Sequence, residues 1–367
     1  MKKKILFILN TYDIMTNKNF NNYSIKKIYD YITGSNSYWI IEFYKKLKKD
    51  YQVVVDYPKI NQKYLENKSY IEIINNKIKK LEPDLIYCNL LDINLEKVLK
   101  KITNSRKLIW LSVKTSNKRI SELKKSYDYI ISGNKEIHKL ARKNKFKNFE
   151  LMISSPANKK YSKKNFLCRR KEIYFAGSLG NDFKYRLEVL EYIKKRFATK
   201  FRIRNLVERY FFVKIFTNQL LIFFPNFTKY LYEKKILPIF NTLKKFNSEE
   251  IFGKTLLSEM EKYQIIINVH SGFDQNNNTN SRVFEALSAG CLLFCEENEF
   301  MKKFFIGNKH VVYFNSLKDL ENKISFFLNN PKKSFLIARA GNLLFNKLHT
   351  SDYRFKEFKG IIKKIIN

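Results

Sequence analysis

Cysteine and histidine are both scarce in this chain of 367 residues. The four cysteines are Cys88, Cys168, Cys291 and Cys295, and no two of them form a C-x-x-C pair. The four histidines have no spacing typical of zinc ligands. We therefore expect no zinc site, and we interpret the cysteines as small buried hydrophobic residues of a protein in a reducing compartment.

Long apolar runs are also missing. The chain begins Met1-Lys-Lys-Lys-Ile-Leu-Phe-Ile-Leu-Asn10, and this apolar core is too short for a secretory signal peptide. It suits a first buried strand instead. No segment offers the ~20 consecutive apolar residues of a membrane-spanning helix. We expect a cytoplasmic protein, and leave open a place at the inner face of the membrane.

Acidic residues are few compared with basic ones. There are 34 Asp and Glu against 71 Lys and Arg, which gives a formal net charge of +37. Such a charge suggests nucleic-acid binding, but the lysines are scattered along the whole chain and no nucleic-acid module is recognisable. A solvated lysine surface is the favoured interpretation, and we expect no nucleic-acid partner. A basic face toward anionic lipid or a nucleotide is the second interpretation.

The length and the order of elements predict two α/β domains. We expect a first domain over residues 1–165, a second over 166–350, and a C-terminal helix over 351–367 that packs back toward the first domain. Residues 158–170 have the composition of a linker. The expected strands of the first domain are 4–9, 52–56, 83–88, 107–112, 127–132 and 150–153, and its expected helices are 34–49, 71–81 and 94–102.

The stretch from Asn278 to Glu297 carries the strongest signal. A buried strand over 265–270 leads into a polar loop over 271–280, and Asn280 or Ser281 can cap the helix that follows. Gly290 lies where a left-handed helix stop is expected, and an apolar strand over 291–295 comes next. Ligands of open parallel sheets bind beyond the carboxyl ends of the strands, where this loop and helix start lie.

Arg282 and Glu285 share one face of this helix start. The free N–H groups of the first turn and the guanidinium of Arg282 suit an anion such as a phosphate. The carboxylate of Glu285 can accept two hydroxyl hydrogen bonds from a ribose. From local physics alone, an ordinary Arg–Glu pair on a surface helix explains the two residues equally well.

The core Asn280-Ser-Arg-Val-Phe-Glu285, followed by Ala-Leu-Ser-Ala-Gly290, resembles the C-terminal domain of bacterial glycosyltransferases with the GT-B fold, in which two Rossmann-like domains face each other across a cleft. It is most similar to the CgeB-like group of these enzymes. The resemblance extends over Glu172–Gly180 and Ile251–Arg354, whereas in the first half of the chain it is only architectural.

The resemblance implies a hexosyltransferase-type enzyme that moves a sugar from a nucleotide-sugar to a glycan, lipid-linked or protein acceptor in cell-envelope glycan synthesis. It assigns Glu285 to the ribose of the donor. It assigns the helix start at Asn280, together with Arg282 and the turn at Gly177 and Ser178, to the diphosphate. The acceptor would dock near the loop with Gly34 and Ser35, and no metal or other cofactor is expected.

One position departs from the family pattern. Many retaining members carry a second glutamate eight positions before the first, where this chain has Asn277; that acidic role is either absent here or moved, with Asp274 as a candidate. Retention and inversion of stereochemistry therefore stay open. An inverting enzyme needs a base, for which Asp13 is a candidate. His270 could touch the sugar or the diphosphate, or be structural.

Residues 201–246 do not follow the strand–helix alternation. Their aromatic run is flanked by basic residues, which suits an interfacial contact with an anionic membrane; an inserted helix packed on the second domain is the other interpretation. For the whole chain, the alternatives to an enzyme are a non-catalytic sugar-nucleotide binder and a basic nucleic-acid-binding protein.

Overall fold

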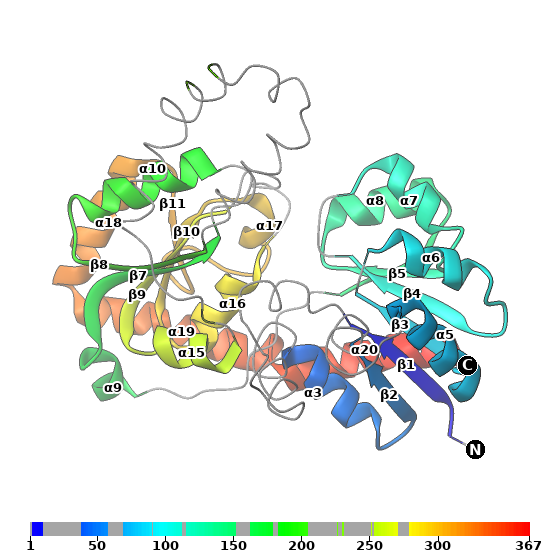
Figure 1. Cartoon of the computed structure of the whole chain (residues 1–367). Coiled ribbons are helices and arrows are strands. Elements are labelled where there is room, and N and C mark those ends of the chain that lie inside the picture. The colour runs from blue at the N-terminus through cyan, green and yellow to red at the C-terminus, as the bar shows by residue number, and fades with distance from the viewer. Residues whose placement is uncertain are drawn as a thin grey trace. The chain divides into compact units, whose positions relative to one another are not determined.

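The computed structural model forms two compact units (Figure 1). One consists of Met1–Lys159, Phe252–Thr255 and Leu344–Asn367, and the other of Lys160–Ile251 and Leu256–Leu343. The structure describes residues 2–9, 38–57, 69–89, 91–111, 115–151, 162–178, 183–204, 226, 230, 251, 253–270 and 279–367. The predictions for Asp13, Gly34, Ser35, Asp274 and Asn277, and for all of 201–246 except 201–204, 226 and 230, lie outside these residues. Residues 201–204 belong to a strand of the second sheet, so the segment that departs from the strand–helix alternation was predicted to begin too early.

The first unit is built on a six-stranded parallel sheet with the order β2-β1-β3-β4-β5-β6. Its strands are β1 (Lys4–Ile8), β2 (Gln52–Asp56), β3 (Leu85–Cys88), β4 (Arg106–Trp110), β5 (Tyr129–Ser132) and β6 (Lys147–Glu150). Its helices are α3 (Tyr38–Leu47), α5 (Tyr70–Leu81), α6 (Ile93–Lys100), α7 (Asn117–Leu123), α8 (Lys135–Lys143) and α20 (Ser351–Ile366). Burial on both faces explains why the inner strands are almost wholly apolar.

The two faces of this sheet carry different helices. Alternate strand residues such as Leu6, Ile86 and Ile109 pack against α5, α6, α7 and α8. The other alternate residues, such as Phe7 and Tyr87, pack against α3 and α20. This alternation follows from the period of two in a strand. Side-chain caps begin the helices, as in the capping box of Ser69 and Glu72 at α5.

Helix α20 belongs to the core of the first unit although it lies at the far end of the sequence. Its buried residues are Arg354, Phe358, Ile361, Ile362 and Ile365. The ring of Phe358 lies 5.3 Å from that of Phe43 and 5.7 Å from that of Tyr87, measured between centroids. The C-terminal helix thus completes one layer over the first sheet.

The second unit is built on a five-stranded parallel sheet with the order β11-β10-β9-β7-β8. The strands are β7 (Arg170–Ser178), β8 (Thr199–Arg204), β9 (Tyr263–Asn268), β10 (Leu292–Glu296) and β11 (Val312–Phe314). The helices are α9 (Lys163–Leu167), α10 (Phe183–Lys194), α15 (Gly253–Met260), α16 (Ser281–Ser288), α17 (Glu299–Lys302), α18 (Leu317–Asn329) and α19 (Pro331–Leu348). The first residues of α15, up to Thr255, and the last residues of α19, from Leu344, are counted with the first unit. One core joins α10, α18 and the first half of α19 to one face of the sheet.

Several elements differ from the sequence prediction. The sixth strand covers 147–150 rather than 150–153, and α7 and α8 were not predicted. The expected linker contains α9 and the start of β7. Cys88, Cys291 and Cys295 are buried as expected, but Cys168, the C-cap residue of the short helix α9, is exposed. Among the helices that the structure describes, none is long and apolar enough to cross a bilayer.

Candidate functional site

The order of strands creates a switch point in the second sheet. After β7 the chain adds β8 on one side of it and then returns to add β9 on the other. The loops that follow β7 and β9 therefore leave in opposite directions, and this is where open α/β sheets bind ligands. The carboxyl end of β7 holds Gly177 and Ser178, and that of β9 leads to His270.

Helix α16 begins directly beside this switch point. Its N-cap residue is Asn280, as predicted, but the side chain of Asn280 does not cap the helix. The amide Nδ2 donates instead to Oδ1 of Asn268 at 3.0 Å, which fastens the helix start to the end of β9. At the other end Gly290 has φ 63°, and Cys291 N–H donates to Ala286 O at 3.1 Å. The predicted left-handed glycine stop is confirmed.

Arg282 connects α16 to the neighbouring strand. Its Nε donates to the carbonyl of Ala176 at 3.0 Å, one residue before Gly177. Its guanidinium also pairs with the carboxylate of Glu285, one turn further along the helix. The side chain of Arg282 thus links the start of α16, which follows β9, to the carboxyl end of β7.

The burial of Glu285 argues against an ordinary surface pair. The residue is 5% exposed, whereas the side chain of Arg282 is 22% exposed. A carboxylate so buried is costly unless a charge or donors face it, and Arg282 supplies them. A ligand hydroxyl that reaches Glu285 would find an acceptor already oriented by its partner.

A chain of hydrogen bonds holds His270 behind the helix start. The backbone N–H of His270 donates to Oε2 of Glu296 at 2.6 Å, and its Nδ1 lies 3.3 Å from the same oxygen. Nε2 of His270 lies 3.4 Å from Nδ2 of Asn268, and Oδ1 of Asn268 accepts from Asn280. A proton on Nδ1 fits both contacts, since Nε2 is then free to accept from the amide.

His270 is only 6% exposed, and both of its ring nitrogens face protein groups. This arrangement favours a role in positioning α16 over direct proton transfer to a substrate. The hydroxyl of Tyr185 also bonds the carboxylate of Glu296; burial and then the charge of Glu296 raise the pKa of Tyr185. A catalytic role for His270 stays a prediction.

Two further side chains at the switch point were not predicted from the sequence. Arg186 on α10 is buried and donates to the carbonyl of Val269 at 2.6 Å, and its guanidinium lies 5.9 Å from the ring centroid of Phe175. Glu296 at the end of β10 holds His270. No motif identifies either residue, because their partners come from strands far apart in the sequence.

Gly177 and Ser178, expected in a turn, are still paired with β8 as the last residues of β7. The residues that follow, 179–182, lie outside the described residues. Together the groups at this edge offer the start of a helix, one partly exposed guanidinium and one buried carboxylate. Such a set can hold an anion and a hydroxyl-bearing group side by side. Among the residues that the structure describes, no cluster of three metal-ligating side chains occurs.

Residues 222–360 match a family model described as glycosyl transferase-like. This segment contains α16 and the switch-point residues of β9 and β10. No curated protein matches the chain.

Solved structures resemble the whole chain. Sucrose-phosphate synthase from Thermosynechococcus elongatus has a TM-score of 0.62 at 10% identity, with 99% of both chains covered. The Anabaena protein HepE, solved with UDP and glucose, has a TM-score of 0.60 at 10% identity over 99% of this chain and 100% of that one. A glycosyltransferase from Rickettsia africae has a TM-score of 0.56 at 15% identity, with 100% of this chain and 99% of that one covered. The chain therefore has the GT-B fold, with two Rossmann-like α/β units.

Proposed function

We propose that this protein is a glycosyltransferase that moves a sugar from a nucleotide-sugar donor to an acceptor. The observation that carries the proposal is the buried Glu285, paired with Arg282 at the switch point of the second sheet. The match over residues 222–360 and the complex of HepE with UDP and glucose support it.

In the proposed complex the nucleotide part of the donor lies across the carboxyl ends of β7 and β9. The carboxylate of Glu285 accepts hydrogen bonds from the two ribose hydroxyls. Arg282, the first turn of α16 and the end of β7 at Gly177 neutralise the diphosphate, whose charge grows as the bond to the sugar breaks. We propose that no metal ion is needed for this step, because Arg282 and the helix start supply the positive charge.

The finer assignments are part of the same proposal. We infer a member of the CgeB-like group, with a hexose as the transferred sugar and a role in cell-envelope glycan synthesis. The acceptor is a glycan, a lipid-linked saccharide or a protein, and the site of action is the cytoplasm. These points rest on the resemblance of the Asn280–Gly290 segment.

A panel of UDP-, GDP- and dTDP-sugars in a thermal-shift assay tests the donor site. A ligand at one hundred times its dissociation constant adds about 2.7 kcal/mol to the free energy of unfolding. We expect one nucleotide class to raise the melting temperature. In the variant Glu285→Gln its affinity should fall by about 10- to 100-fold, because the acceptor loses its charge and one of its two oxygens becomes an NH2 donor.

The matched control is Glu321→Gln, on α18. Glu321 also belongs to an ion pair, with Arg196 at 3.4 Å, but it lies outside the switch point. This variant should bind the donor like the unchanged protein. Turnover that survives both Glu285→Ala and Arg282→Ala would show that the site is assigned wrongly. A protein that binds nucleotide but turns over no donor would be the non-catalytic binder.

A further inference from the structure

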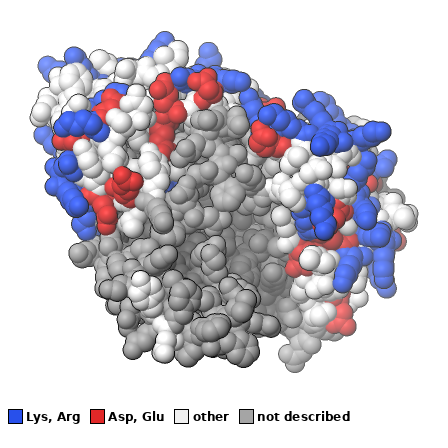
Figure 2. All heavy atoms as spheres, turned by 90° about the horizontal axis from the view of Figure 1, so that it is seen from above, with Lys and Arg blue, Asp and Glu red and all other residues white. Residues whose placement is uncertain are grey.

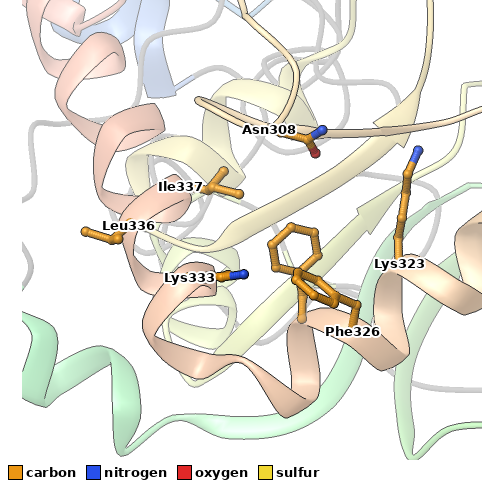
Figure 3. Close-up of a pocket in the computed structure, with 7 residues that line it drawn as sticks. Asn308, Lys323, Phe326, Lys333, Leu336 and Ile337 are labelled. Carbon is orange, nitrogen blue, oxygen red and sulfur yellow. The ribbon is translucent and has the colours of Figure 1, made fainter.

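A cavity of about 450 Å³ opens between α18 and α19, on the opposite face of the second sheet from α16. Its lining is mostly apolar, as Figure 3 shows, and consists of Asn308, Lys323, Phe326, Phe327, Lys333, Leu336 and Ile337. None of these residues belongs to the switch-point site. The cavity therefore calls for a separate explanation.

Large apolar side chains stand in solvent in the lining of this cavity, at Phe326 and Leu336, and two turns further along α19, at Leu343. Phe326 is 45% exposed, Leu336 is 60% exposed and Leu343 is 56% exposed. Leu336 and Leu343 are seven residues apart on α19, so both face the same way. Exposed apolar side chains grouped on one surface, rather than scattered singly, indicate a contact with a partner.

The same surface is basic. Lys332, Lys333 and Arg339 are exposed on α19, at positions that share a face with Leu336, and α19 contains no acidic residue. The ammonium of Lys333 lies 4.9 Å from the ring centroid of Phe326. On α18 the carboxylate of Asp319 is paired with Lys323 at 2.7 Å. The apolar side chains are thus bordered by positive charge.

We propose that this α18–α19 surface binds the face of an anionic phospholipid bilayer. Phe326, Leu336 and Leu343 would enter the boundary between head groups and acyl chains, and the cavity would receive part of an acyl chain. Lys332, Lys333 and Arg339 would face the lipid phosphates. An apolar stripe bordered by basic residues has the chemistry of interfacial helices.

Charge complementarity favours a bilayer over a second copy of the chain. A symmetric dimer would bring two such basic surfaces together in a protein whose net charge is already +37. In Figure 2 the basic side chains on the face shown are spread over both units rather than gathered in one patch. Basic residues alone therefore do not distinguish the α18–α19 surface from the rest of the protein. The exposed leucines that lie beside its basic residues do.

The proposal goes beyond sugar transfer and holds whether or not the protein is an enzyme. Flotation of the full chain with vesicles tests it. Phosphatidylcholine vesicles that contain phosphatidylglycerol should carry the protein upward, whereas vesicles of phosphatidylcholine alone should not. Each basic residue near an anionic surface strengthens binding by a factor of roughly five. The triple variant K332E/K333E/R339E should therefore bind at least about 100-fold more weakly.

The matched control is K139E/R142E/K143E, which makes the same change of charge on α8 of the first unit, where these residues are exposed. It should lose far less binding. The double variant Leu336→Gln and Leu343→Gln should bind several-fold more weakly with the charge unchanged. Circular dichroism checks that each variant is folded. Failure of the unchanged protein to bind, or equal losses in the two triple variants, would overturn the proposal.

Discussion

His349 is a buried histidine held against an arginine. Nδ1 of His349 lies 2.6 Å from a terminal nitrogen of Arg354, and the two residues are 2% and 6% exposed. Since arginine can only donate, the ring must be neutral to accept this hydrogen bond. Burial, and then the charge of Arg354, lower the pKa of His349 to about 3.

This pair predicts a loss of stability in acid. The unfolded chain binds a proton at His349 below about pH 6.5, whereas the folded protein does not until about pH 3. The contribution of His349 to the free energy of unfolding is therefore complete above pH 6.5. It decreases as the pH falls toward 3, by at most about 1.4 kcal/mol per pH unit. Urea unfolding at pH 7 and pH 4 measures it.

Other groups also titrate in this range, so the comparison needs a variant. His349→Gln keeps a hydrogen-bond acceptor for Arg354 but has no proton to gain. We expect it to be less stable at pH 7 by about 1 kcal/mol and to lose less stability between pH 7 and pH 4. An unchanged loss would show that other residues are responsible.

The site shows which residues a sequence can and cannot reveal. Arg282 and Glu285 could be predicted together because they are one turn apart in a single helix. Glu296 could not, because it meets His270 only after β9 and β10 have paired. The burial of Glu285 was equally hidden, since it depends on the position of β7 beside α16.

At the scale of elements, α19 is fitted closely to its neighbours at Gly341. A Cβ atom there would lie 2.4 Å from the carbonyl oxygen of His310 and 2.8 Å from Cδ2 of Leu287. The next residue, Asn342, donates to the carbonyls of Leu287 and Ser288 at 2.9 and 3.1 Å and so closes the end of α16. The close approach of the His310 carbonyl and the Leu287 side chain leaves no room for a Cβ atom, which explains the glycine at this position inside the helix.

Two glycine-to-alanine variants in neighbouring helices should change stability in opposite directions. Alanine favours a helix by up to about 1 kcal/mol over glycine. At Gly360 in α20 no atom lies within 4 Å of the added Cβ, so Gly360→Ala should stabilise the protein by about that amount. Gly341→Ala should instead cost about 1–3 kcal/mol through the clash with His310. Thermal unfolding of both variants tests the packing of α19, and stabilisation by Gly341→Ala would contradict it.

The elements that the sequence missed share a physical cause. Strand β6 reads Lys-Asn-Phe-Glu and lies at the edge of its sheet, so it lacks the apolar run that identifies the buried strands. Helices α7 and α8 are short and highly charged, and only a few of their residues are buried. In contrast, β2 and α5 were located within one residue: β2 is also an edge strand but contains the β-branched run Val53-Val-Val55, and α5 is amphipathic and begins with a capping box.

At the scale of the whole molecule, the first unit depends on a helix from the far end of the chain. Phe358, Ile361, Ile362 and Ile365 of α20 lie in the same core as Phe7 and Tyr87. Removing one such large side chain lowers the free energy of unfolding by roughly 3–5 kcal/mol. The whole free energy of unfolding of a domain is only about 5–15 kcal/mol. Removal of residues 351–367 should therefore unfold the first unit and leave the second protected.

Hydrogen exchange followed by mass spectrometry measures the two units separately. In point variants, Phe358→Ala should lower the protection of the first unit strongly. Tyr353→Ala, at a residue of the same helix that is 39% exposed, should have little effect. Retained protection of β1 and β3 after the truncation would show that α20 is only an accessory layer.

The distance along the chain between this helix and its sheet also sets a delay during protein synthesis. From the end of β6 at residue 150 to the start of α20 at residue 351 is a span of 201 residues. At about 5–20 residues per second, a ribosome needs roughly 10–40 seconds to translate it. For that time the face of the sheet with Phe7 and Tyr87 has no α20 to cover it, and transiently exposed apolar surface of this kind is what makes folding chains prone to aggregate and dependent on chaperones.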